Sequence, residues 1–229
     1  MAENLARVRE RVARAAQRAG RRADDITLVA VSKTFPPEAM RAAYDAGVRH
    51  FGENRVQEMA AKRPQLAGLD ATWHFIGHLQ SNKARHAAEL FDRIDAVDSI
   101  ALARKLESVA VEIHRGLPVL IEVNVGGEAT KSGASEAALA DLVPEVAACF
   151  HLNLRGLMAV PPYSDDPEQA RPYFRRLREL RDKFSRILSY ELPVLSMGMS
   201  HDFEVAIEEG ATEIRIGTAL FGARPAKPG

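Results

Sequence analysis

Eight short apolar runs recur along the chain and predict β-strands at residues 26–33, 50–54, 72–78, 93–99, 117–125, 152–160, 193–198 and 212–218. Segments with helical spacing of apolar residues lie between them, such as "PPEAMRAAYDAG" after the first run. The runs are continuously apolar rather than alternating, which is typical of parallel strands covered on their outer face. The pattern therefore predicts an α/β fold, a (β/α)8 TIM-type barrel.

An extra helix is expected ahead of this repeat, because "MAENLARVRERVARAAQRAG" is amphipathic and lacks the apolar stretch of a signal peptide. We see no internal linker, so residues 1–229 are expected to form a single domain, with 224–229 as a frayed tail. An open doubly wound sheet is the alternative. It lacks support, because no predicted strand is followed by a G-x-G-x-x-G turn.

Composition narrows the class of protein. The chain has 229 residues, 46% hydrophobic, with 31 basic and 31 acidic residues and no net charge. That balance argues against a nucleic-acid or anionic-membrane partner. Cys149 is the one cysteine, and its apolar helical surroundings are typical of a small core residue rather than a nucleophile. No apolar run is long enough to cross a bilayer, so we expect a cytoplasmic protein.

Polar residues gather at the ends of the predicted strands, where barrels of this type carry their active sites. Lys33 closes "LVAVSK" and is one of only 7 lysines among the 31 basic residues. An ammonium at the end of a buried strand can lose its proton, pair with an anion, or form an imine with a carbonyl ligand. A solvated lysine at a strand end is the alternative.

Two loops near the end of the sequence look suited to a phosphate group. "SMGMS" precedes a helix expected to begin at about His201, with Ser200 as its N-cap, and "RIGTALFG" turns from the last strand into a short helix. Barrels often bind phosphate with the loops after their seventh and eighth strands. Ordinary helix capping and turn glycines are the alternative explanation of both loops.

Arg215 shares one face of the last strand with Glu213 and Gly217. If it points into the barrel mouth, it needs an acceptor, either a heterocyclic nitrogen or a carboxylate in a structural ion pair. His74 lies between Trp73 and Phe75 and is expected to be a hydrogen-bonded core residue, whereas His201 borders a loop or faces solvent. No His, Cys or Asp cluster has metal-ligand spacing, so we expect no metal.

Several motifs together resemble the pyridoxal phosphate homeostasis proteins, small relatives of the N-terminal barrel of alanine racemase. They are "TLVAVSKT", "FGENRVQE", "WHFIGHLQSNK", "VNVGGEATKSG", "RGLMAVPP" and "SMGMSHDFEVAIEEGATEIRIGTALFGAR". The resemblance runs in register from about residue 5 to residue 224. One departure is Ala87, which stands where the family usually has an aliphatic residue four positions after Lys83 and affects helix packing more than chemistry.

The resemblance implies that pyridoxal 5'-phosphate is the cofactor and that Lys33 holds it as a Schiff base. It places Ser200, Gly217 and Thr218 at the phosphate, with Met199 supplying backbone, and Arg215 at the pyridine nitrogen. Residues expected to border the ring are Asn54, His78 and Gln80. The role of Lys131, in "TKSG", stays open.

The chemistry expected of such a site favours a binder over an enzyme. Arginine at the ring nitrogen does not let the ring act as a fully protonated electron sink, and racemisation needs acid and base groups on both faces of the substrate carbon. The sequence offers no appended domain to supply the second base. We therefore expect a cofactor-binding protein without robust catalysis. The resemblance implies a role in vitamin B6 homeostasis, with PLP-dependent apoenzymes as partners, and a monomer or weak homodimer. The alternatives are a weak PLP-dependent racemase or lyase, and a Schiff-base aldolase without a cofactor.

Overall fold

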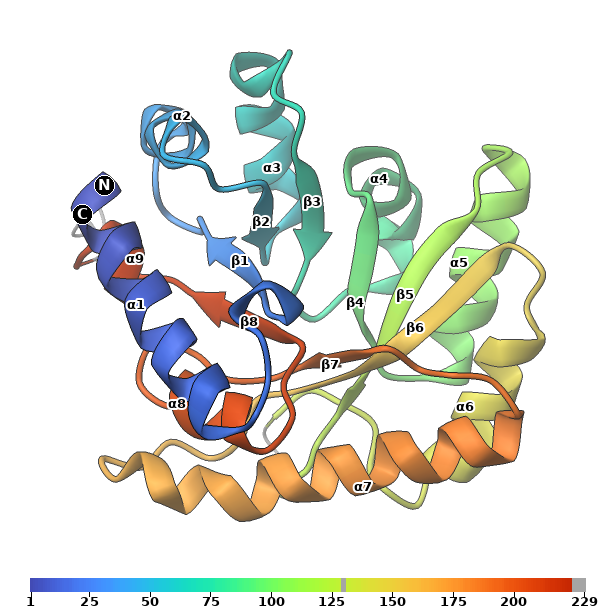
Figure 1. Ribbon diagram of the computed structural model, residues 1–229. Helices are drawn as coiled ribbons and strands as arrows, with labels where there is room; N and C mark the ends of the chain where they lie inside the picture. Colours follow the sequence, from blue (N-terminus) through green and yellow to red (C-terminus); the bar gives the residue numbers. More distant parts are fainter. Residues whose placement is uncertain (129–130, 224–229) are drawn as a thin grey trace.

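The computed structural model describes residues 1–128 and 131–223, and within them eight parallel strands form a closed barrel (Figure 1). Each strand pairs with the next along the chain, and β1 closes the sheet by pairing with β8. The strands are β1 (Thr27–Val31), β2 (His50–Glu53), β3 (Thr72–Phe75), β4 (Arg93–Val97), β5 (Leu117–Val123), β6 (Leu152–Ala159), β7 (Val194–Ser196) and β8 (Glu213–Ile216).

Helices follow the strands around the outside of the barrel. They are α1 (Ala2–Arg18), α2 (Pro37–Asp45), α3 (Val56–Lys62), α4 (Ala84–Leu90), α5 (Ile100–Glu112), α6 (Leu139–Ala148), α7 (Arg171–Leu188), α8 (Phe203–Glu208) and α9 (Thr218–Phe221). The extra helix α1 lies beside α8 and α9 (Figure 1). Arg11 forms an ion pair of 2.9 Å with Glu204 of α8, and Asn4 donates to the Leu220 carbonyl of α9 at 2.9 Å.

The core lies mainly between the sheet and these helices. Helix α7 shows why the sequence folds this way, since Phe174, Leu177, Leu180 and Phe184 recur at helical spacing and are all buried. Each such side chain contributes about 1.5–3 kcal/mol when it leaves water. The arginines and glutamates between them form the exposed face of the helix.

The predicted (β/α)8 barrel with an extra N-terminal helix is confirmed, and the open-sheet alternative is wrong because β1 and β8 are hydrogen-bonded neighbours. Every strand is shorter than its apolar run, because the last residues of each run leave the ladder for the rim loops. The expected tail at 224–229 lies outside the described residues. In the part of the chain that the structure describes, no helix is both long and apolar enough to cross a membrane.

Candidate functional site

A pocket of about 300 Å³ opens at the carboxyl ends of the strands. Its walls come from β1 and the turn after it, and from the loops that follow β6, β7 and β8. Six of the residues predicted for the site line it, namely Lys33, Met199, Ser200, Arg215, Gly217 and Thr218. The fold thus brings together groups that lie up to 185 positions apart in the sequence (33 to 218).

Lys33 lies in a turn two residues beyond the end of β1 and is half-buried at the pocket wall. Ser32 before it is fully buried, and Thr34 after it has φ of 70°, in the left-handed region that side chains other than glycine seldom adopt. The prediction that Lys33 closes the strand is therefore wrong in detail. Its position at the carboxyl rim of the barrel is as expected.

The loop after β7 is built around Gly198, whose φ is 92°. A Cβ there would lie 2.6 Å from that of Ala206 and 2.9 Å from the Cα of Phe203, so only glycine lets the loop pack against α8. The Gly198 carbonyl accepts from the Arg215 backbone N–H at 2.9 Å, which joins this loop to β8.

The expected N-cap role of Ser200 is wrong. Helix α8 begins at Phe203 with Asp202 as the residue before it, and Asp202 Oδ1 accepts from the Met199 backbone N–H at 2.6 Å. The Ser200 hydroxyl instead accepts from the backbone N–H of Ala219 at 3.2 Å. Ser200 therefore connects the two loops that were predicted to bind phosphate.

Gly217 ends the last strand run and precedes α9. A Cβ at this position would make ordinary contacts of 3.7 Å with Val31, so the fold itself does not require glycine here. Both Gly217 and Val31 line the pocket, so the missing side chain leaves room in the pocket wall.

Arg215 lies at the inner end of the pocket and is 3% exposed. Its guanidinium donates to Ser196 Oγ and to the Ala159 carbonyl, both at 2.8 Å. The expected common face with Glu213 is confirmed, because both side chains point into the barrel while Ile214 and Ile216 join the outer core. Burial lowers the pKa of Arg215 from its ordinary value, and nearby carboxylates, Glu213 first, oppose the change.

Three residues that were expected to border the ring, Asn54, His78 and Gln80, lie apart from this group. Asn54 and His78 line a second pocket of about 420 Å³, together with Gln80 and Lys83. His78 Nδ1 is 3.1 Å from Asp98 Oδ2. Lys131 also lies outside the first pocket, and its ammonium contacts Glu128 and the Pro161 carbonyl.

The loop after β6 is a part of the first pocket that sequence reasoning missed. Pro161, Pro162, Tyr163 and Ser164 line it, and the Tyr163 ring lies 5.8 Å from that of His201. The paired prolines after the sixth apolar run were the available signal, because they turn the chain abruptly at the strand end. His201 lines the pocket and remains exposed, which combines the two positions expected for it.

Glu122 on β5 is a second group that the sequence did not reveal. It is 8% exposed, and its Oε2 has no hydrogen-bond partner among the described residues. Burial raises the pKa of Glu122 to about 7, Arg215 acts in the opposite direction, and Asp98 adds to the rise. Glu122 looked like part of an apolar strand, because seven of the other eight residues in "LPVLIEVNV" are apolar.

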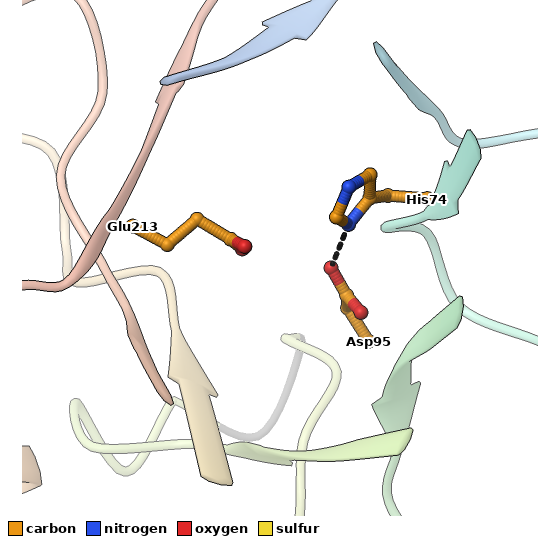
Figure 2. Close-up of side chains that lie close together, drawn as sticks. All are labelled: His74, Asp95 and Glu213. Carbon is orange, nitrogen blue, oxygen red and sulfur yellow. Dashed lines mark hydrogen bonds and ion pairs between the residues drawn. The ribbon is translucent and has the colours of Figure 1, made fainter. Parts of the chain in front are cut away.

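A polar cluster fills the barrel near the amino ends of the strands. Figure 2 shows Glu213 reaching across toward His74, whose Nδ1 lies 3.2 Å from Asp95 Oδ2. These three side chains offer possible metal ligands within 4.8 Å of one another. Arg93, however, bonds to Asp95 at 2.5 and 2.9 Å and to Glu213 at 2.5 Å, so a cation already balances the two carboxylates.

The charges in this cluster are strongly coupled. Burial alone would raise the pKa of Asp95, but Arg93 and His74 outweigh burial and hold it well below its ordinary value. His74 is 1% exposed and contacts His50 at 3.0 Å as well as Asp95, which confirms it as a hydrogen-bonded core residue. The arrangement supports the expectation of no metal, which stays a prediction.

Comparison with known proteins gives the same family over almost the whole chain. The sequence profile of alanine racemase, N-terminal domain, matches residues 4–225. A pyridoxal phosphate homeostasis protein of Aquifex aeolicus is 49% identical over 222 residues, which is 97% of each chain. One of Pseudomonas aeruginosa is 48% identical over 227 residues, 98% of this chain and 96% of that protein.

Solved structures agree. PipY of Synechococcus elongatus without PLP has a TM-score of 0.88 at 41% identity, covering 97% of this chain and all of that one. The same protein with PLP bound has a TM-score of 0.85 at 40% identity, covering 96% and 99%. Alanine racemase of Clostridium difficile shares the fold, with a TM-score of 0.73 at 15% identity over 89% of this chain and 54% of that one. The chain therefore belongs to the pyridoxal phosphate homeostasis proteins, within the family of the alanine racemase N-terminal domain.

Proposed function

We propose that this protein binds pyridoxal 5'-phosphate in the first pocket, as a Schiff base on Lys33, and takes part in the intracellular homeostasis and supply of that cofactor. The observation that carries the proposal is the meeting of Lys33, Arg215 and the two loops after β7 and β8 around one cavity. The names of the relatives and the PLP-bound form of PipY, a protein 40% identical to this chain, support it.

The residues of the pocket fit the chemical groups of the cofactor. Its aldehyde condenses with a primary amine, which forms a C=N bond and releases water. Lys33 supplies that amine: its uncharged Nζ provides the lone pair for the new bond, and both of its protons leave with the aldehyde oxygen as water.

The phosphate is assigned to the loops after β7 and β8 that line the pocket. Met199, Ser200, Gly217 and Thr218 line the pocket there; the Ser200 and Thr218 hydroxyls suit a phosphate, whereas the Met199 N–H already donates to Asp202. Gly217 leaves room there because it lacks a side chain.

Arg215 is assigned to the ring nitrogen. It is fixed by Ser196 and the Ala159 carbonyl, so it is a preorganised donor that needs no rearrangement on binding. Asn54 and His78 remain proposed neighbours of the ring, from the side of the second pocket.

We place the protein among cofactor binders rather than robust enzymes because Arg215 keeps its own proton. A guanidinium can donate a hydrogen bond to the ring nitrogen but does not transfer a proton to it, so the ring is a weak electron sink. A weak PLP-dependent racemase or lyase is the alternative. Turnover of a panel of amino acids with chiral analysis separates the two, and a rate well above that of free PLP would refute the binder.

Reduction with borohydride after incubation with PLP tests the central proposal. Peptide mass spectrometry should show one pyridoxyl adduct, on the peptide that contains Lys33. Lys33→Ala should lose this adduct, whereas Lys105→Ala, on the exposed face of α5, should keep it. A protein that takes up no PLP, or that carries the adduct elsewhere, would contradict the proposal.

The proposal also covers the transfer of the cofactor to other proteins and the oligomeric state of this protein. PLP-dependent apoenzymes are the proposed recipients, and the loaded protein should restore the activity of an apoenzyme on mixing. The protein is proposed to act as a monomer or weak homodimer, which sedimentation at several concentrations would measure.

A further inference from the structure

A ring of hydrogen bonds, partly buried, holds the backbone next to Lys33, and its centre is a second lysine. Lys62, the last residue of α3, is 7% exposed. Its Nζ donates to Glu53 Oε1 at 2.7 Å, to Glu58 Oε1 at 2.7 Å and to the Ser32 carbonyl at 3.0 Å. An ammonium has three N–H donors, so every donor of Lys62 has an acceptor.

The residue type fits this geometry. The protein uses 24 arginines and only 7 lysines, yet it places a lysine here. Three acceptors around one point suit a compact ammonium, whereas a planar guanidinium presents its donors in a flat fork. A buried cation is tolerated only when it is paired and hydrogen-bonded, and here two carboxylates do this.

The ring holds the backbone on both sides of Lys33. On one side, Ser32 donates its hydroxyl to Glu53 Oε1 at 2.8 Å, and its carbonyl accepts from Lys62. On the other side, the Thr34 backbone N–H donates to Glu58 Oε1 at 2.6 Å. Glu53 and Glu58 thus each accept one bond from Lys62 and one from a neighbour of Lys33.

Thr34 shows why this restraint is needed. Its φ of 70° lies in the left-handed region, which is unfavourable for a β-branched residue and persists only where surrounding contacts enforce it. The bond from Thr34 to Glu58 is such a contact. Without it, the turn should relax toward ordinary backbone angles, and the Lys33 side chain would move with it.

We infer that Lys62, together with Glu53 and Glu58, is a positioning residue that aims the Lys33 amine at the aldehyde of the bound cofactor. Lys62 itself does not touch the pocket, since it is absent from the lining of the cavity that holds Lys33. The inference rests on the proposed function and adds to it a separable prediction. Phosphate anchoring should depend on the loops after β7 and β8, and covalent attachment should depend on Lys62 as well.

The test separates these two quantities. For wild type, Lys62→Met and the control Lys105→Met, total PLP bound is measured after gel filtration, and the covalent fraction after borohydride reduction. Lys62→Met should still bind PLP, but its rate of Schiff-base formation should fall by about tenfold or more, as expected when a reacting group is misplaced. Lys62→Arg should not restore the rate, and Lys105→Met should match wild type.

A milder variant keeps the inference testable if Lys62→Met does not fold. Glu58→Ala removes the acceptor of the Thr34 N–H at a site with a side chain 22% exposed, and Glu89→Ala removes an exposed partner of Arg85 as its control. Glu58→Ala should slow attachment and change the position of the Schiff-base absorbance band, whereas Glu89→Ala should do neither.

The outcomes are distinct. Wild type that takes up no PLP, or attaches none to Lys33, would remove the proposed function itself. The positioning role alone would be overturned by a different result. In that case wild type attaches PLP normally, and folded Lys62→Met and Glu58→Ala proteins attach it at the same rate and with the same spectrum as wild type.

Discussion

Replacing Glu122 by glutamine should stabilise the protein at alkaline pH. The Glu122 residue is 8% exposed, its Oε2 lacks a hydrogen-bond partner among the described residues, and Asp98 lies near enough to disfavour a second negative charge. Burial is the largest cause of the raised pKa, and Arg215 and His78 offset only part of it. Glutamine has the shape of the protonated carboxyl and never ionises.

The magnitude follows from the difference between the folded and unfolded pKa. The pKa of Glu122 rises from 4.5 to about 7, and each unit corresponds to about 1.4 kcal/mol. The folded state keeps a proton that the unfolded state releases, so stability falls as the pH rises from 4.5 to about 7 and stays low above it. The ionised carboxyl should therefore cost about 3 kcal/mol at pH 8 relative to its protonated form.

Urea unfolding of the apoprotein at pH 5 and pH 8 measures this effect. Glu122→Gln should gain roughly 2–3 kcal/mol over wild type at pH 8 and little at pH 5, where wild type is itself protonated. Glu191→Gln, an exposed carboxylate, is the matched control and should change neither value. Equal stability of Glu122→Gln and wild type at pH 8 would show that the carboxylate is solvated or paired, and would refute the reasoning.

Three further substitutions probe the loops and the barrel interior. Gly198→Ala should cost about 1–3 kcal/mol in urea unfolding, because its Cβ would lie 2.6 Å from that of Ala206 at a positive φ; an unchanged midpoint would contradict this. Gly217→Ala should leave apoprotein stability within about 0.5 kcal/mol but weaken PLP binding several-fold in a spectral titration, since its Cβ meets only Val31, at 3.7 Å; equal affinity would place the cofactor elsewhere. Arg93→Leu should cost about 3–5 kcal/mol, because it leaves two buried carboxylates without their cation, and a protein as stable as wild type would argue that they are protonated.

The fold could be predicted from the sequence because the same pattern, an apolar run followed by a helical segment, is repeated along the chain. Eight apolar runs, each followed by a helical segment, indicate parallel strands whichever run is examined first, and an error of two residues in one strand does not change the architecture. Lys33 and Arg215 were readable for the same reason. The carboxyl end of each run marks the rim of the barrel, and the side of a strand follows from alternation.

The features of the site that the sequence did not predict depend on contacts between elements that are distant in the sequence. Ser200 has the form of an N-cap, and only the packed loops show its hydroxyl accepting from Ala219 instead. Lys62 ends an amphipathic helix, where a lysine normally faces water, and only the packing of α3 against β2 brings its ammonium within 2.7 Å of Glu53. Asn54 was grouped with Lys33 because strand ends share a rim, although a rim can hold two pockets.

Lys33 and Lys62 both lie near the end of β1, but their surroundings give their amines different reactivity toward an aldehyde. An ammonium that donates three hydrogen bonds has no lone pair with which to attack a carbonyl, so Lys62 in its ring is inert toward an aldehyde. Ser32 and Thr34, the residues before and after Lys33, belong to that ring, whereas Lys33 lines the pocket. The same network that fixes Lys33 therefore also prevents Lys62 from competing with it. The proposed single adduct on Lys33 would then follow from the network as well as from the pocket, and partial labelling of Lys62 in Glu58→Ala would be the direct sign of this effect.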